Sequence, residues 1–370
     1  MRKKYESIIN FINKVIKKQR NIKKIAICNT FYMRSGGRSR VIEQQAKELS
    51  NEGYYVTVYA LFGEKLRDVE FRQEIVANHV NPYLRPIYMI LAPSLPVSIK
   101  LIKELRMYDL IITHDGYPFG FWAYLATRHS RAPYIYWYHL PEKLERCFSG
   151  LKKYYVMLLQ YFDQRSWFVC KADFVIAVSE AAKNDLEKAT NLKNVVVIPN
   201  KVDYKRFSNE ADITQIEKKF GISKEDPIIL FVGRISPQKN IHILIEIFNL
   251  VKKSIPNAKL VIVGKPSVKE YLEKIKFIAN KDVIFTGYIE DNELATLYKM
   301  ANVYASCSLS ESFNLPLKEA QLFNLPIVAF DIPVHKEVTD NGVLIEPGNM
   351  EKFAEELCNI LKKSVPFHHT

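Results

Sequence analysis

Two charged motifs in the second half of the chain have residue types and spacings that could bind a ligand. The first, Phe231-Val-Gly-Arg-Ile-Ser-Pro-Gln-Lys239, ends an apolar run and then offers a guanidinium and an ammonium. The second, Glu311-Ser-Phe-Asn-Leu-Pro-Leu-Lys-Glu319, places two carboxylates across a loop that should become a helix. Cations suit a diphosphate, and carboxylates accept hydrogen bonds from sugar hydroxyls. Because a nucleotide-sugar presents both groups, the two motifs together predict a nucleotide-sugar site.

The positions of the two cations follow from the expected backbone. Gly233 allows a tight turn after an apolar strand, so Arg234 should project from the carboxyl end of that strand. Lys239 should lie near the start of the next helix, and the two cations could then stabilise a departing diphosphate. The alternative is that both are solvated surface cations of a lysine-rich protein.

The two glutamates flank the expected start of a helix. Pro316 fits a first helical turn, so the backbone of Phe313–Leu317 should point N–H groups at an anion. Glu311 precedes that turn, and Glu319 lies one turn in, where a carboxylate can accept two hydrogen bonds from the vicinal hydroxyls of a ribose. Acids that merely complement the helix dipole would explain Glu319 well and Glu311 less well.

The N-terminal half carries weaker signals. Gly36 and Gly37 follow the first expected strand and precede a helix, where they would let an anion approach the backbone closely. His114 and His139 each end an apolar run, Ile111-Ile-Thr-His and Tyr136-Trp-Tyr-His. Two histidines on one sheet edge suggest a site, but with no cluster of Asp or Glu beside them in the sequence they do not predict a metal centre.

Composition limits the fold and the partners. The 370 residues are 48% hydrophobic and 25% charged, as expected for a globular chain with room for two cores. The net charge of +13 favours anionic partners, whether nucleic acid, acidic lipid or phosphorylated substrate. Neither an apolar run of about 18 residues nor a secretory signal is present, so we expect a cytoplasmic protein.

The five cysteines are odd in number and widely spaced, without a Cys-x-x-Cys pair. This pattern argues against a disulfide framework and against a zinc cluster. Cys28, Cys170 and Cys307 fall in or beside apolar runs and should be buried.

Runs rich in Val and Ile alternate with helical patterns from residue 23 onward, and the alternation begins again after residue 210. Runs that are apolar throughout indicate parallel strands covered on both faces. The chain therefore predicts an α/β protein with two doubly wound Rossmann-like domains of about 150 residues each. We expect strands at Lys24–Cys28, Tyr54–Leu61, Asp109–Thr113, Pro133–His139, Phe174–Ser179 and Val195–Pro199, and then at Ile228–Val232, Leu260–Gly264, Val283–Gly287, Val303–Cys307 and Ile327–Phe330.

The domain boundaries follow from the same alternation. A basic amphipathic helix is expected over residues 1–21, the first domain over 22–200, and the second over 201–350. A C-terminal helix and tail would occupy 351–370. Ligands of doubly wound sheets bind at the carboxyl ends of the strands, so two such domains facing each other would form a cleft.

Further motifs make the chain resemble a family 4 glycosyltransferase, of the group of retaining enzymes with the two-domain GT-B fold. The resemblance runs from about residue 23 to residue 350, and the order and spacing of its motifs make it specific. These motifs are Ser35-Gly-Gly37, Ala172-Asp173 with Val178-Ser179, Ile198-Pro-Asn200 with Val202-Asp203, Gly233-Arg234 with Lys239, the Glu311/Glu319 pair, and Asn341-Gly342 through Pro347-Gly348.

The resemblance implies a role for each donor-site residue. Arg234 and Lys239 would hold the donor diphosphate, Glu319 the ribose hydroxyls, and Glu311 would lie near the donor sugar. The backbone facing the phosphates would be that of Phe313, Asn314 and Leu315.

The resemblance also implies roles for the first domain. Gly37, after Gly36, would close on the diphosphate, and His139 would lie where acceptor and donor meet. Family members need no divalent metal for transfer, and this chain has no Asp-x-Asp motif, so we expect no metal and no other cofactor. The candidate catalytic residues are His139, Arg234, Lys239 and Glu311.

The chain departs from the family pattern at several glycines. Asn314, Asn240 and Lys201 stand where relatives usually have glycine, and an asparagine is the tolerable replacement where φ must be positive. Asp331-Ile-Pro-Val-His335 replaces a turn that commonly contains glycine near the donor sugar, so the identity of the sugar stays open.

Residues 1–20 form an addition with a helical apolar stripe flanked by basic residues. Such a helix is typical of a membrane-surface element, although the stripe could equally pack on the protein body. The apolar positions are Ile8, Phe11, Ile12, Val15 and Ile16.

The sequence thus predicts a metal-independent, retaining glycosyltransferase in the cytoplasm, possibly peripheral at the inner face of the cell membrane. It would move a hexose from a nucleotide diphosphate sugar to a glycan or lipid-linked acceptor. One alternative is a nucleotide-sugar epimerase of the same architecture, which would need no acceptor. A weaker one, resting on charge alone, is nonspecific nucleic-acid binding.

Overall fold

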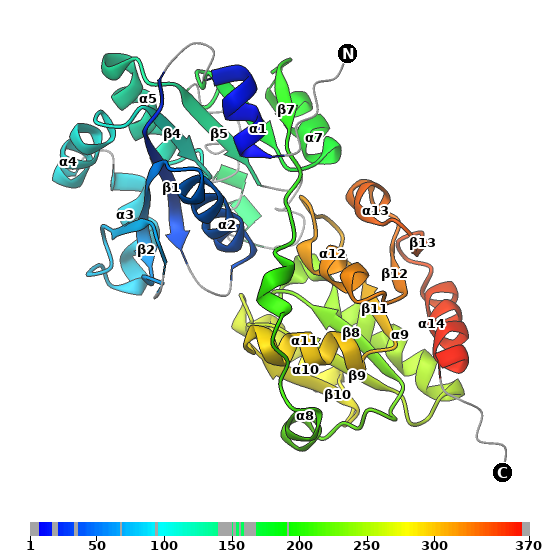
Figure 1. The fold of residues 1–370 in the computed structure, drawn as a ribbon. Helices are drawn as coiled ribbons and strands as arrows, with labels where there is room; N and C mark the ends of the chain where they lie inside the picture. Colours follow the sequence, from blue (N-terminus) through cyan, green and yellow to red (C-terminus); the bar gives the residue numbers. More distant parts are fainter. Residues whose placement is uncertain are drawn as a thin grey trace. The chain divides into compact units, whose positions relative to one another are not determined.

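The computed structural model describes residues 7–16, 21–32, 36–66, 69–92, 95–139, 150, 153–154, 157–158, 168–190 and 192–364. The chain divides into two compact units, Met1–Lys201 and Val202–Thr370. Each unit has its own parallel β-sheet with helices packed against it (Figure 1). The division lies one residue beyond the end of the first domain expected from the sequence.

The sheet of unit 1 has seven parallel strands in the order β3-β2-β1-β4-β5-β6-β7. After β3 the chain returns to the other side of β1, so the order reverses between β1 and β4. Ligands of doubly wound sheets bind at the carboxyl ends beside such a switch point. The strands are β1 (Lys24–Tyr32), β2 (Tyr55–Gly63), β3 (Arg72–Ile75), β4 (Leu110–Thr113), β5 (Tyr134–Tyr138), β6 (Phe174–Ala177) and β7 (Val195–Val197).

Strands β4 and β5 are buried along their whole length, as their continuous apolar runs predict. The connections between strands supply the helices that cover the sheet. These are α2 (Gly37–Asn51), α3 (Arg85–Leu91, after the short 3₁₀ turn η2, Pro82–Leu84), α4 (Pro96–Leu105), α5 (Phe119–Ser130) and α7 (Glu180–Thr190).

The N-terminal helix packs on unit 1 through its apolar stripe. It consists of α1 (Ile8–Phe11) and a π-helical continuation, η1 (Ile12–Ile16), and Ile8, Phe11, Ile12 and Ile16 are all buried. The Phe11 ring meets Phe174 of β6 edge-on, with ring centroids 5.2 Å apart. The stripe therefore does not face a membrane, and of the two interpretations left open by the sequence the packed helix is the one observed.

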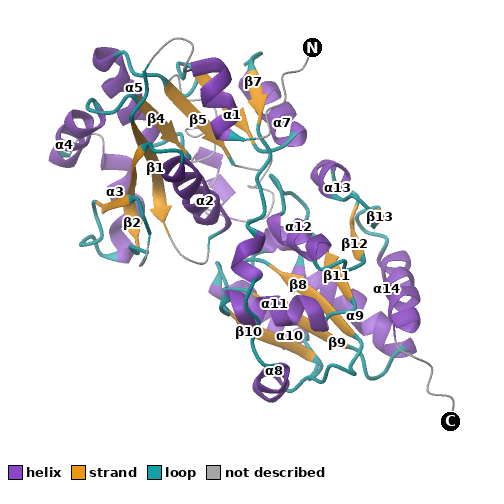
Figure 2. Ribbon diagram, viewed as in Figure 1, coloured by secondary structure: helices purple, strands orange, loops and turns teal. Residues whose placement is uncertain are grey.

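The sheet of unit 2 has six parallel strands in the order β10-β9-β8-β11-β12-β13, with its switch point between β8 and β11. Helices cover both faces of this sheet (Figure 2). The strands are β8 (Ile228–Val232), β9 (Lys259–Val263), β10 (Val283–Gly287), β11 (Val303–Ser306), β12 (Ile327–Phe330) and β13 (Val343–Ile345).

The core on one face of this second sheet is formed with α9, α10 and α14, while α11 and α12 contact β8, β11 and β12. The helices are α8 (Ile213–Phe220), α9 (Ile241–Ser254), α10 (Lys269–Ile278), α11 (Asp291–Met300), α12 (Leu315–Leu322), α13 (Pro333–Val338) and α14 (Met350–Ser364), with short 3₁₀ turns η5 (Tyr204–Phe207) and η6 (Pro237–Lys239).

Three local features differ from the sequence-based expectation. Strands β3 and β13 were not predicted, and both lie at the edge of a sheet. Cys28 and Cys307 are buried as expected, whereas Cys170 is exposed because it lies in the turn that precedes β6. Within the described part of the chain, no helix combines the length and apolar character needed to cross a bilayer.

Candidate functional site

The two charged motifs of unit 2 meet at the carboxyl edge of its sheet, on either side of the switch point. Arg234 and Lys239 follow β8, and Glu311 follows β11, the strand that pairs with β8. The backbone is tight here, because a Cβ placed on Gly264 would lie 1.9 Å from the carbonyl oxygen of Gly233. The turn that aims Arg234 therefore depends on a glycine in the neighbouring chain segment as well as on Gly233.

Lys239 and Glu311 form a largely buried ion pair. The loops that carry them are joined by two further hydrogen bonds. Leu309 N–H donates to the Gln238 carbonyl at 3.0 Å, and the Gln238 amide donates to the Ser310 carbonyl at 2.5 Å. Burial by itself would raise the pKa of Glu311, but the Lys239 ammonium outweighs it and holds that pKa below its usual range. Glu311 is therefore a carboxylate, and the ammonium is fixed beside it.

Asn314 and Asn240 both have left-handed backbone conformations, with φ of 64° and 56°. This explains why asparagine stands at two positions where glycine is usual, since asparagine tolerates this region better than other side chains. Lys201 differs, because it is not among the described residues with positive φ.

The side chain of Asn314 is held by His335, which is fully buried. The Asn314 amide lies 2.9 Å from His335 Nε2, and His335 Nδ1 lies 2.7 Å from the carbonyl oxygen of Phe330. Burial lowers the pKa of His335, although the Glu311 carboxylate acts in the opposite direction. The ring is thus neutral, with the proton on Nδ1 donated to Phe330 and Nε2 accepting from Asn314.

Helix α12 begins directly after Asn314, with Pro316 in its first turn as predicted. Phe313 and Asn314 are buried and Leu315 is half-buried, so this segment of backbone is fixed in place beside Glu311. A helix N-terminus that follows a buried carboxylate and an ammonium is suited to a phosphate group.

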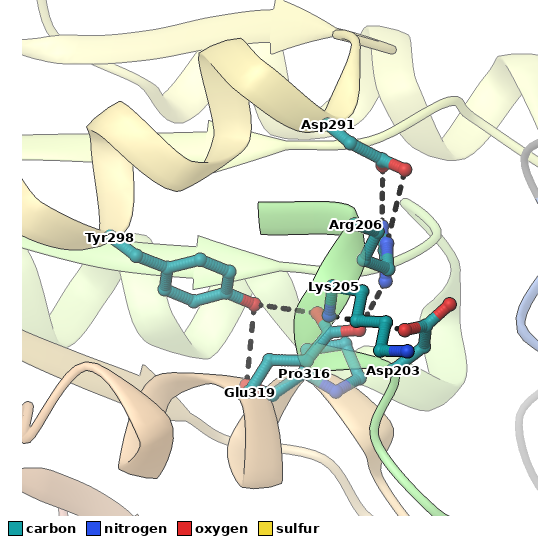
Figure 3. A network of polar contacts seen from close by, with 7 residues as sticks. All are labelled: Asp203, Lys205, Arg206, Asp291, Tyr298, Pro316 and Glu319. Carbon is teal, nitrogen blue, oxygen red and sulfur yellow. Dashed lines mark hydrogen bonds and ion pairs between the residues drawn. The ribbon is translucent and has the colours of Figure 1, made fainter. Parts of the chain in front are cut away.

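Glu319, in contrast, lies inside unit 2 with only 1% of its surface exposed. One oxygen accepts from Arg206 of η5 at 2.6 Å, and the other from the hydroxyl of Tyr298 of α11 at 2.9 Å. Arg206 is also bound by both oxygens of Asp291, at 2.5 and 3.1 Å. Figure 3 shows this network joining η5, α11 and α12. A ribose does not reach Glu319 in this conformation, so the ribose-binding role stays a prediction.

In unit 1, the two histidines singled out from the sequence lie together at the carboxyl edge. His114 Nδ1 and His139 Nε2 are 2.7 Å apart, so one ring donates a hydrogen bond to the other. Burial, reinforced by the Arg38 guanidinium, lowers the pKa of His114 well below its usual value. Burial, His114 and Arg38 together lower the pKa of His139 in the same way. Both rings are therefore neutral at physiological pH.

Two residues that the sequence analysis missed complete this edge. Arg38, in the first turn of α2, forms an ion pair with Asp115, whose other oxygen accepts from the backbone N–H of Thr30 in β1. Asp115 directly follows His114 at the end of a strand, and this position in the sequence could have indicated that it belongs to the site. Arg206 and Tyr298 were also missed, because nothing local marks a residue whose partner lies in a distant helix.

The glycine pair lies where it was expected, at the start of α2. Gly36 is the N-cap residue with an extended conformation, and a Cβ placed on Gly37 would meet no atom within 4 Å. Packing within the protein therefore does not require a glycine at position 37. Because Gly37 has no side chain, the space at the start of α2 is open. Ser35 lies outside the described residues.

In the described part of the chain, no three His, Cys, Asp or Glu side chains gather closely enough to hold a metal ion. Lys239 and Arg234 supply positive charge at the unit 2 site.

Two doubly wound parallel sheets, each with charged or polar groups at its switch point, are the architecture found in GT-B glycosyltransferases. The comparisons with known families agree and give the family itself. Residues 35–206 match the model described as Glycosyltransferase Family 4, and residues 212–369 match the model described as Glycosyl transferases group 1. The chain therefore belongs to the family 4 glycosyltransferases and is a glycosyltransferase.

Individual relatives are distant but cover most of the chain. An uncharacterized glycosyltransferase of Haemophilus influenzae is 26% identical over 334 residues, 87% of this chain and 86% of that protein. An alpha-monoglucosyldiacylglycerol synthase of Streptococcus pneumoniae is 24% identical over 314 residues, 82% of this chain and 70% of that protein. The comparisons lend no support to the epimerase that the sequence left open.

Among solved structures, the Anabaena protein HepE in complex with UDP and glucose has a similar fold. Its TM-score is 0.73 at 22% sequence identity, and the match covers 94% of this chain and 90% of that one.

Proposed function

We propose that this protein is a retaining, metal-independent enzyme that transfers a hexose from a nucleotide diphosphate sugar to a glycan or lipid-linked acceptor. It would act in the cytoplasm, at the inner face of the cell membrane. A nucleotide-sugar donor is supported by the similarity to HepE, which was solved with UDP and glucose. A lipid acceptor is supported by the relative whose name specifies a glucosylated diacylglycerol.

The observation that carries the proposal is the Lys239–Glu311 ion pair at the switch point of unit 2. An ammonium at that position would meet a diphosphate bound at the start of α12, and the adjacent carboxylate would accept from hydroxyls of the sugar. Arg234, exposed at the end of β8, would add a second positive charge.

In the proposed reaction the bond between the anomeric carbon and the diphosphate oxygen breaks, and a bond from the acceptor oxygen to the same face of that carbon forms. The acceptor proton passes to the departing diphosphate. Lys239 and Arg234 stabilise the negative charge that grows on the diphosphate, and this is the contribution that accelerates the step. The neutral His139 would accept or donate a hydrogen bond where the acceptor lies.

Binding is tested first with a thermal-shift panel of UDP-, GDP- and ADP-sugars. A donor present at a hundredfold excess over its Kd should stabilise the folded state by about 2.7 kcal/mol. We expect one nucleotide to raise the melting temperature more than the others, and EDTA to leave that shift unchanged. A panel without any shift would contradict the donor assignment.

Catalysis is tested with Arg234→Ala and Lys239→Gln, the latter chosen because glutamine can still donate a hydrogen bond to the buried Glu311. Each should lower kcat/KM by about 10²-fold or more. The matched control is Lys281→Ala, an exposed lysine in the same unit, which should retain full turnover. Near-normal turnover of both site variants would remove the diphosphate role. Donor turnover that needs no acceptor would point to an epimerase.

A further inference from the structure

Unit 1 presents an exposed apolar surface on α3 and α4 that the proposed site does not use. Ile87, Ile90 and Leu91 of α3 are 57%, 50% and 51% exposed, and Ile99 of α4 is 61% exposed. Spacings of three and four residues place the three α3 side chains on one face of their helix. Exposed apolar side chains gathered on one helix face are typical of an interaction surface.

Both helices are held to the unit by their opposite faces, so the exposed faces are available. On α3, Tyr88 packs edge-on against Phe62 of β2, with ring centroids 5.9 Å apart. On α4, Leu101 and Leu105 are buried, and the Ser98 hydroxyl accepts from the Trp122 indole of α5 at 2.8 Å. The exposed isoleucines therefore contribute nothing to the core of unit 1.

The charge of this surface is mainly positive. Its cations are Arg85, Lys100 and Lys103, and its one acidic residue within α3 and α4 is Glu104, which lies 3.8 Å from the Lys100 ammonium. Lys100 and Lys103 are exposed on α4, near Ile99 in the helix. Lysines around an exposed apolar stripe complement a surface that is negatively charged and has an apolar interior.

The surface also adjoins the edge of the sheet where His114 and His139 lie. Phe62, which α3 contacts, is near the carboxyl end of β2, and the Tyr117 hydroxyl, two residues after Asp115, donates to the Ile90 carbonyl at 2.6 Å. Figure 1 shows α3 next to β2 in unit 1, and α4 packs against α5. An acceptor held in a membrane at this surface would therefore approach unit 1 from the edge that carries the histidine pair.

We propose that the outward faces of α3 and α4 dock on an anionic lipid bilayer and bring the acceptor edge of unit 1 to a lipid-anchored acceptor. The docking is inferred from the exposed surface alone, whereas the lipid-anchored acceptor rests on the proposed glycosyl transfer. Ile87, Ile90, Leu91 and Ile99 enter the headgroup region, while Lys100 and Lys103 contact lipid phosphates. Membrane contact is thus assigned to α3 and α4 and not to the N-terminal helix, whose apolar stripe is buried.

The test is sedimentation of the full chain with vesicles of phosphatidylcholine alone or mixed with phosphatidylglycerol. The variant Ile87→Gln/Ile90→Gln/Leu91→Gln removes the apolar stripe with a residue that favours helix. Its partition onto the mixed vesicles should fall at least about tenfold relative to the unsubstituted protein. Lys100→Gln/Lys103→Gln should reduce the preference for phosphatidylglycerol over phosphatidylcholine. The matched control is Phe277→Ser in unit 2, where a phenylalanine 91% exposed is removed, and it should bind as before.

Donor-induced thermal shifts, measured on the same variants, separate this inference from the proposed function, since all variants should keep them. The inference is overturned if the unsubstituted protein does not sediment with the mixed vesicles, or if the triple glutamine variant sediments equally well. It is also overturned if the unsubstituted protein is a dimer that ignores vesicles and the triple variant is a monomer, because the surface is then an interface between copies.

Discussion

The carboxylate of Glu319 shows how much a residue's role depends on the groups that surround it. By its motif position it should accept from a ribose, yet both of its oxygens already accept from Arg206 and Tyr298. The Arg206 guanidinium is itself largely buried, so it needs an anionic partner in place. This geometry indicates that Glu319 stabilises unit 2 in the absence of donor.

Glu319→Gln should therefore lower the free energy of unfolding of the protein without nucleotide by about 2 kcal/mol, because it weakens a buried ion pair. Asp291→Asn is the control, since Asp291 is partly exposed and should cost less than about 1 kcal/mol. Urea denaturation of both variants gives the comparison. Unchanged stability combined with weaker UDP binding would instead show that the carboxylate serves the ribose and that the network rearranges on binding.

Asn314 and His335 illustrate a second residue-scale effect. A glycine at 314 would satisfy the positive φ, but it could not bind His335 Nε2. The asparagine supplies both the left-handed backbone and an anchor for the loop that carries Glu311. The departure from the family's glycine is thus tied to the histidine at the end of Asp331-Ile-Pro-Val-His335.

At the scale of elements, the strands found from the sequence are those with continuous apolar runs. The two strands that were missed, β3 and β13, are edge strands. The sequence of β3, Arg-Gln-Glu-Ile, contains a single apolar residue, and only its Gln73 is buried. The edge strands β7 and β10 were recognised by their apolar runs, so β3 was missed because it is polar, and β13, Val-Leu-Ile, because it is only three residues long.

The N-terminal helix also belongs to this scale, since only packing decides what its apolar stripe faces. Phe11→Ala should lower the free energy of unfolding by about 3 kcal/mol, because a buried ring and its contact with Phe174 are lost. Lys14→Ala, on the exposed side of the same segment, should change stability little. Chemical denaturation checks both. If Phe11→Ala left stability unchanged and abolished vesicle binding, the stripe would face lipid after all.

At the scale of the whole molecule, three buried histidines couple stability to pH in both units. The pKa values of His114, His139 and His335 are lowered by burial, so the unfolded chain binds protons that the folded chain does not. Stability should therefore fall as the pH drops below the ordinary histidine pKa of about 6.5, by up to about 1.4 kcal/mol per pH unit for each histidine. Glu311 acts in the same direction, but only at lower pH, because its pKa is also lowered.

Urea denaturation at a series of pH values between about 5 and 8 measures this slope. His335→Asn should reduce it, since an asparagine can still donate to the Phe330 carbonyl but does not titrate. The exposed His79→Gln should leave it as it is. A slope that is the same in all three proteins would mean that the buried rings do not control the acid sensitivity.

The sequence by itself determined the fold class, most of the central strands and the two charged motifs of unit 2. These are local properties: apolar runs, a turn glycine, a proline in a first helical turn and fixed short spacings. The tertiary structure alone decided which groups meet, because partners far apart in sequence leave no local pattern. Arg206 and Glu319 are 113 residues apart, and His114 and His139 are 25 apart, after separate strands. The same holds for the buried N-terminal stripe and the exposed one on α3, which look alike in sequence and differ only in what packs against them.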